Sequence, residues 1–252
     1  MEMKGRRFER CWGIAALVVL GLVPPALFAG GTQSEVAGNL KRASFAKEHA
    51  SGDVRRIADW VVDSADNQGM PFVIIDKPNA KVFVFHADGR VRGAAPVLLG
   101  LARGDDSAPG IGERDLKDIP PKDRTTPAGR FVAAVGKNYH GVDVVWVDYA
   151  AAISMHRVVK GTPAERRAQR LASPTSDDNR ISYGCINVPV KFFDSVIIPS
   201  FKGTSGIVYV MPETRPARTV FGSYDVEERA QRRLAASTRP PAAGAVAVSA
   251  NN

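Results

Sequence analysis

The stretches Pro71–Asp76 (PFVIID) and Lys81–Gly100 (KVFVFHADGRVRGAAPVLLG) decide the fold class of this chain. They contain three runs rich in β-branched and aromatic residues, a composition typical of strands. The turn residues Lys77-Pro78-Asn79 and Asp88-Gly89 separate these runs, and Asp-Gly between two such runs indicates a hairpin. The region therefore predicts three consecutive strands.

Outward from this region, strand signals remain more frequent than helix signals. Further strands are expected at 131–135, at 142–156 and at 206–211, with a loop at 103–125. Helices are expected at 54–65, within 163–171, at 189–198 and at most once beyond residue 212, around 226–234. This balance predicts a mainly β fold with a few short helices, arranged as a sandwich or barrel.

The N-terminus reads as an export signal. Four basic residues in the first ten precede an apolar run, Cys11–Ala29, and the small residues Ala29–Gly31 offer a cleavage site. The pair Pro24-Pro25 interrupts the run before it reaches the roughly 20 residues of a spanning helix, which favours cleavage. The alternative is an uncleaved anchor that associates the protein with a membrane.

Four segments are expected along the 252 residues. They are a signal peptide or N-terminal anchor (1–31), a linker with an amphipathic helix (32–70), the main domain (71–212) and a basic, low-complexity C-terminal tail (213–252). The net charge of +8 favours an acidic partner or simply solubility. Export argues against nucleic acid as that partner.

Cys185, within Ser182–Asn187 (SYGCIN), is the candidate for chemistry. The chain has two cysteines and the other lies in the leader, so a mature protein contains no disulfide. A lone thiol on a Gly-flanked turn is the arrangement that a cysteine nucleophile needs, whereas an inert core thiol is the alternative. One cysteine and four scattered histidines do not make a metal site, so we expect no metal.

A cysteine nucleophile needs help to ionise, and the sequence offers two sources. A helix beginning about four residues after Cys185 would direct its dipole at the sulfur, and a histidine would act as general base. Among the histidines, His156 ends a β run, where a strand can hold it rigidly, and it is the best candidate. We also expect Gly184 to permit a positive φ, and the N–H groups of Tyr183, Gly184 and Cys185 to bind an oxyanion.

These residues resemble a known family. The elements Thr126-Pro127-x-Gly129-x-Phe131, His156 and Ser182-x-Gly184-Cys185-Ile186-Asn187 are similar to the signature of L,D-transpeptidases of the YkuD type, over residues 71–212. The resemblance implies a mainly β catalytic domain that acts without a cofactor on peptidoglycan stem peptides, in the periplasm or cell envelope. It also implies a role in cell-wall construction and cell shape.

The reaction implied by the resemblance is acyl transfer. The cysteine attacks a stem tetrapeptide, releases the terminal D-alanine and forms a thioester, which an amine then resolves. By position, Cys185 is the nucleophile, His156 is the base and the main-chain carbonyl of Arg157 orients the imidazole. Ser182 and Asn187 support the loop by hydrogen bonding.

This chain departs from the family in two places. Tyr183 stands where the family usually has histidine, and 160–180 forms a basic insertion. We expect the insertion to be a lid or rim that binds substrate carboxylates, or else a solvated excursion. Arg180, just before the motif, either binds a substrate carboxylate or is solvated. An L,D-carboxypeptidase, another cysteine hydrolase and a non-catalytic wall-binding domain are the alternative functions.

Overall fold

The structure is a computed structural model and describes residues 40–238. Within that range the chain is mainly β with a few short helices, which confirms the predicted fold class. The main sheet has the strand order β3-β2-β1-β10-β5-β6-β7-β9, and β4 pairs separately with β8. The strands are β1 (Phe72–Asp76), β2 (Lys81–Phe85), β3 (Val91–Pro96), β4 (Leu99–Gly100), β5 (Gly129–Lys137), β6 (Asp143–Asp148), β7 (Ile153–Arg157), β8 (Arg180–Ser182), β9 (Ile186–Val188) and β10 (Gly206–Val210).

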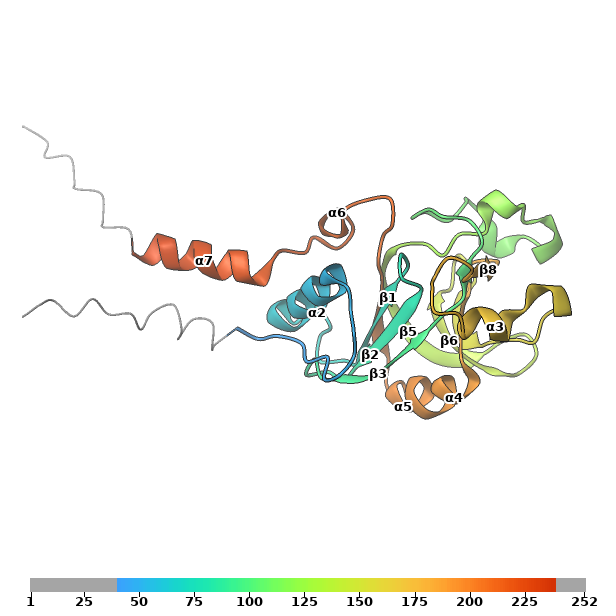
Figure 1. Cartoon of the computed structure of the whole chain (residues 1–252), viewed down its shortest axis with the longest axis horizontal. Coiled ribbons are helices and arrows are strands. Elements are labelled where there is room, and N and C mark those ends of the chain that lie inside the picture. Colours follow the sequence, from blue (N-terminus) through green and yellow to red (C-terminus); the bar gives the residue numbers. More distant parts are fainter. Residues whose placement is uncertain (1–39, 239–252) are drawn as a thin grey trace, which may run out of the picture.

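Most helices are short and lie around this sheet, whereas α7 extends away from it beyond α2 (Figure 1). The α-helices are α2 (Gly52–Ser64), α3 (Arg167–Leu171), α4 (Val190–Phe192), α5 (Ile198–Ser200), α6 (Ala217–Phe221) and α7 (Val226–Ser237). The π-helical turn η5 (Phe193–Ile197) joins α4 to α5, and the 3-10 turns are η1 (Ile111–Glu113), η2 (Leu116–Asp118), η3 (Pro121–Asp123) and η4 (Pro163–Glu165).

Two hydrophobic cores lie on opposite faces of the sheet. On one face, Val54, Ile57 and Val61 of α2 pack with Phe72 and Ile74 of β1. The other core contains the alternate residues of the same strands together with apolar side chains of η5. The helix at 190–200 therefore covers the face opposite to α2.

Strands β1 and β10 lie in the middle of the sheet and are buried on both faces. They pair in parallel, although they come from opposite ends of the folded domain. Strands covered on both faces have continuous apolar sequences, and both Phe72–Asp76 (FVIID) and Gly206–Val210 (GIVYV) fit this rule. Phe72 stacks on Phe85 of β2 with their ring centroids 4.6 Å apart.

Most expected elements are present, and two expectations need correction. Beyond residue 212 we expected at most one helix, but α6 precedes α7 and packs Phe221 against Trp60 and Tyr209. Strand β9 also separates Cys185 from the next helix. The segment 1–31, expected to be an export signal or anchor, and the last part of the tail lie outside the described residues. Within 40–238, no helix has the length and apolarity needed to span a bilayer.

Candidate active site

Strand pairing brings His156 next to Cys185. Cys185 lies in the turn between β8 and β9, and β9 pairs in parallel with β7, which carries His156. In this register Met155 lies opposite Ile186, and both side chains are buried in the core. Because successive side chains of a strand point to opposite faces, the neighbours of this pair, His156 and Cys185, share the other face.

The imidazole of His156 and the thiol of Cys185 are close enough to shift each other's pKa, and Cys185 Sγ lies 3.6 Å from the carbonyl oxygen of Ala152. Burial raises the pKa of the Cys185 thiol, but the hydrogen bond and charge of His156 outweigh burial and lower the pKa overall. Burial also lowers the pKa of His156, and the hydrogen bond and charge of Cys185 outweigh it and raise that pKa. Each group thus stabilises the charged form of the other, which favours a thiolate–imidazolium pair.

The main chain fixes the tautomer of His156. Its Nδ1 lies 2.7 Å from the carbonyl oxygen of Arg157, the contact expected from the resemblance. A carbonyl oxygen only accepts hydrogen bonds, so Nδ1 carries a proton. Nε2 is then the nitrogen that exchanges a proton with Cys185.

Ser154 is a site residue that sequence reasoning missed. It lies two residues before His156 on β7, and its hydroxyl donates to the sulfur of Cys185 at 3.7 Å. Burial raises the pKa of the thiol, and the backbone N–H and the hydroxyl of Ser154 both act to lower it. Residues i and i+2 of a strand share a face, so the position of Ser154 relative to His156 was the signal available.

The carbonyl oxygen of Cys185 is held by two side chains. Ser182 Oγ donates to it at 2.6 Å and Asn187 Nδ2 at 3.2 Å. Both side chains are buried, with Asn187 1% exposed. These contacts agree with the expectation that Ser182 and Asn187 support the loop Ser182–Asn187, which we call the cysteine loop.

Gly184 has the positive φ that the motif suggested, at 131°. A Cβ at this position would lie 2.8 Å from the carbonyl oxygen of Thr125, so the loop leaves no room for a side chain. The N–H of Gly184 donates to Ser182 Oγ at 3.1 Å and is not directed at a substrate. The N–H groups of Tyr183 and Cys185 are therefore the remaining oxyanion candidates.

The helix that follows Cys185 does not act on the sulfur as expected. The three residues of β9 lie between Cys185 and the N-cap residue Pro189. At about 3.3 Å per strand residue, they place the helix start roughly 10 Å or more along the chain. The effect of a helix dipole falls off within a turn, so His156 and Ser154 are the groups that favour the thiolate.

Tyr183 packs against the loop at 103–125. The guanidinium carbon of Arg124 lies 4.0 Å from the centroid of the Tyr183 ring, and Arg124 Nε donates to the carbonyl of Ile119 at 3.0 Å. A cation over an aromatic face contributes about 0.5–1 kcal/mol at an exposed site. Tyr183 thus anchors a neighbouring loop.

Arg180 is neither solvated nor free to bind a substrate. Its guanidinium forms a two-pronged pair with Glu213, at 3.2 and 2.6 Å, and donates to the carbonyl of Lys77 at 3.1 Å. The Arg180 side chain is 8% exposed. This arginine therefore holds β8 to the segment after β10, and no local pattern identified Glu213 as its partner.

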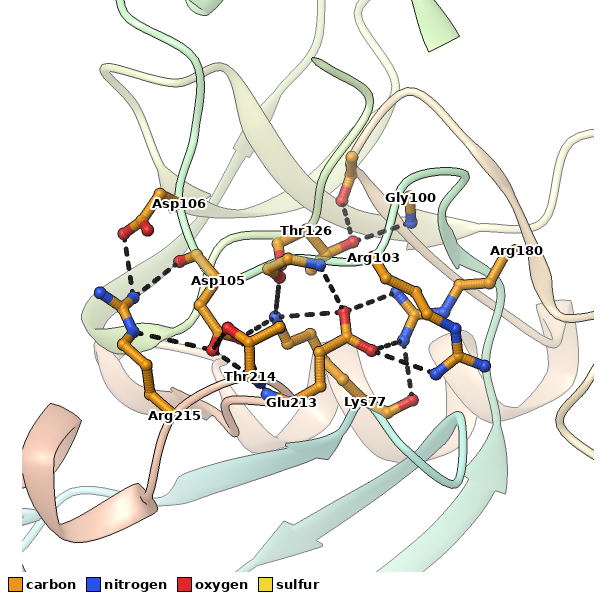
Figure 2. Close-up of polar contacts among 12 residues, drawn as sticks. Lys77, Gly100, Arg103, Asp105, Asp106, Thr126, Arg180, Glu213, Thr214 and Arg215 are labelled. Atoms are coloured by element: carbon orange, nitrogen blue, oxygen red, sulfur yellow. Dashed lines mark hydrogen bonds and ion pairs between the residues drawn. The ribbon is translucent and has the colours of Figure 1, made fainter. Parts of the chain in front are cut away.

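Lys77 and Asp105 are the centre of this buried cluster (Figure 2). Lys77 Nζ donates to Asp105 Oδ1 at 2.8 Å and to the carbonyl of Thr126 at 3.0 Å. Burial lowers the pKa of Lys77, whereas hydrogen bonds from Lys77 and Thr214 outweigh burial and hold the pKa of Asp105 well below its usual range. The cluster connects the ends of β1 and β10 to the loops around the cysteine.

No family model matches this chain, and no curated protein matches it. Solved structures similar to it include L,D-transpeptidases. An L,D-transpeptidase from Enterococcus faecium is 18% identical, with a TM-score of 0.31, over 56% of this chain and 50% of that one. Its catalytic domain alone is 17% identical over 56% of this chain and 96% of the domain, with a TM-score of 0.31.

A second group of similar structures belongs to another named protein. The helical cell shape determining protein Pgp2 from Campylobacter jejuni is 14% identical, with a TM-score of 0.40, over 64% of this chain and 52% of its own. The present chain thus spans about half the length of Pgp2 and of the longer E. faecium chain. These likenesses concern the fold, and the chemistry is argued from the side chains described above.

Within residues 40–238, no group of three His, Cys, Asp or Glu side chains has the arrangement of a metal site. The groups gathered at Cys185 are instead those of nucleophilic catalysis: a sulfur, an oriented imidazole and hydrogen-bond donors that favour the thiolate.

Proposed function

We propose that this chain is a cysteine acyltransferase of the L,D-transpeptidase type that acts on peptidoglycan stem peptides. The observation that carries the proposal is the Cys185–His156 pair, in which Arg157 orients the imidazole and both pKa shifts favour thiolate and imidazolium. In an inert core thiol, by contrast, burial raises the pKa and no such partner is present. The motif around Cys185 supplies the substrate class.

Acylation begins with the thiolate of Cys185. The sulfur attacks the carbonyl carbon of the penultimate residue of a stem tetrapeptide and forms a C–S bond, and the carbonyl electrons move to an oxyanion. In this proposal the N–H groups of Tyr183 and Cys185 bind that oxyanion. As the C–N bond breaks, His156 Nε2 gives its proton to the departing nitrogen of D-alanine, which leaves a thioester on Cys185.

The second half-reaction regenerates the enzyme. An acceptor amine attacks the thioester carbonyl, and the now neutral His156 takes the proton that the amine loses. The C–S bond breaks and restores the thiolate of Cys185. Water in place of the amine gives an L,D-carboxypeptidase with the same nucleophile and base, so the product depends on the acceptor.

The proposed place of action is the periplasm or cell envelope. The pattern at 1–31 supports export, and peptidoglycan is an anionic polymer that suits the net charge of +8.

A β-lactam labelling experiment tests the catalytic proposal. A carbapenem offers a strained amide carbonyl to the thiolate, and acylation increases the intact mass by one drug molecule. We expect this adduct in the native protein and none in Cys185→Ala. A folded native protein that forms no adduct favours the wall-binding domain.

Product analysis then separates the two enzymatic alternatives. A stem tetrapeptide is incubated with and without an added amine acceptor, and the products are identified by mass. A new amide to the acceptor supports the transpeptidase. Tripeptide alone, unchanged by the acceptor, favours the carboxypeptidase.

A further inference from the structure

The insertion at 160–180 reaches the cysteine loop through one buried arginine. The insertion lies at the same end of the molecule as β8, opposite to α2 and α7 (Figure 1). Most of its residues are exposed, but Arg167, the first residue of α3, is 8% exposed. A charged side chain is almost never buried to this degree without partners.

Both sides of the Arg167 guanidinium have a partner. Nε donates to Glu165 Oε2 at 2.7 Å, within the insertion. Nη1 donates to Asn187 Oδ1 at 3.0 Å, in the cysteine loop. Glu165 is itself held by the capping box of η4, in which Thr162 participates, so the carboxylate that orients the guanidinium is fixed.

Arg167 determines which way the Asn187 amide points. A guanidinium only donates, so the oxygen of the Asn187 amide faces Arg167 and the NH₂ group faces the carbonyl of Cys185, at 3.2 Å. Without Arg167, the buried amide oxygen has lost its donor. The amide then gains nothing by keeping its NH₂ group on Cys185.

We propose that Arg167 is a positioning residue for the nucleophile, acting on Cys185 through Asn187, and that the insertion is a structural part of the cysteine loop. The inference rests on the proposed function only in taking Cys185 as the nucleophile. The positive charge of Arg167 also opposes protonation of His156, whose pKa is lowered by burial first and raised overall by Cys185. Arg167 thus acts on both members of the pair.

The test measures thiol chemistry, which does not require the natural substrate. Cys185 is alkylated with iodoacetamide across a pH series in the native protein, Arg167→Met, Arg167→Lys and Arg166→Gln. The titration of His156 is followed by NMR of its ring protons. Arg166 is the exposed neighbour of Arg167 on the same segment, and its replacement is the matched control.

We expect Arg167→Met to lower the alkylation rate about threefold to tenfold and to shift the titration of His156 to higher pH. Arg167→Lys keeps the charge but loses the planar fork, so its His156 titration stays near the native one while alkylation slows. Arg166→Gln changes neither. Native alkylation and native His156 titration in a folded Arg167→Met protein overturn the proposal.

If the Arg167→Met protein does not fold, the Arg167→Lys protein is used to test the proposal. A slower alkylation rate with a native circular dichroism spectrum supports the positioning role, and a native rate overturns it. A protein that alkylates as expected but releases no D-alanine from a stem peptide disproves the proposed function while leaving this inference in place.

Discussion

The hydroxyl of Thr126 donates a hydrogen bond of 2.7 Å to the carbonyl oxygen of Gly184 and accepts one of 2.9 Å from the N–H of Gly100. Thr126 is completely buried, and this bridge connects the start of β5 to the cysteine loop. Within the Thr126-Pro127 motif, the threonine hydroxyl is the group that contacts the cysteine loop.

Thr126→Val removes this bridge with little change in shape. The N–H of Gly100 and the carbonyl of Gly184 lose their partner in a buried site, which costs about 1–3 kcal/mol for each unsatisfied group. We expect the free energy of unfolding in urea to fall by at least about 1 kcal/mol. Thr126→Ser keeps the hydroxyl and is the control, and equal losses in the two variants contradict the role of the hydroxyl.

His156→Gln tests the pH dependence of the thiol. In the native protein His156 lowers the pKa of Cys185 below its usual value, so alkylation continues at pH values where an ordinary thiol with a pKa of about 8.5 is protonated. Without the imidazolium, burial prevails and the pKa rises. We expect the alkylation rate at pH 6 to fall more than about tenfold, a factor of ten for each pKa unit.

The control for His156→Gln is thermal unfolding, which we expect to change little because the ring is held by a single main-chain contact besides the thiol. Alkylation profiles that coincide from pH 5 to 9 rule out the ion pair.

Ser154→Ala isolates the hydroxyl that contacts the sulfur. At 3.7 Å its hydrogen bond is long, and the backbone N–H of Ser154 remains in the variant. We therefore expect a smaller effect than that of His156→Gln: an alkylation midpoint higher by less than about one pH unit. Ser154→Thr restores a hydroxyl and is expected to recover part of the shift. A lower midpoint in Ser154→Ala contradicts the assignment.

Lys77→Met removes the buried cation that donates to Asp105 Oδ1, while Arg215 Nε stays 3.7 Å from Oδ2 of the same carboxylate. Removing one member of a buried ion pair costs about 3–5 kcal/mol. The backbone N–H groups of Glu213 and Thr214 also donate to Asp105, so we expect a loss near the lower end of this range. Urea unfolding measures the loss.

The double variant Lys77→Met/Asp105→Asn tests the coupling of the pair. Because both charges are then absent, we expect it to be more stable than the sum of the single losses predicts. Strict additivity shows that the two side chains do not interact.

The features that could be predicted depend mostly on residues that are close together in the sequence. The runs at 72–76 and 81–85, the hairpin turn at Asp88-Gly89 and the amphipathic helix at 54–65 follow from local period and turn chemistry. The motif around Cys185 likewise predicted a positive φ at Gly184 and loop support by Ser182 and Asn187.

Contacts between distant segments could not be predicted in this way. The parallel pairing of β1 with β10, the pair of Arg180 with Glu213 and the reach of Arg167 to Asn187 each join residues whose proximity depends on the whole sheet. Local patterns carry no information on which segment pairs with which, because loop closure costs little more for distant partners than for near ones.

By itself, then, the amino-acid sequence determined the strands, their turns and the choice of Cys185 as the candidate nucleophile, since these depend on side-chain period and residue chemistry. Tertiary structure alone decided that the imidazole and Ser154 meet the sulfur on one face, and that Arg180 turns inward to Glu213. The reason is strand register: a shift of one residue between β7 and β9 would place His156 in the core and leave Cys185 without a base.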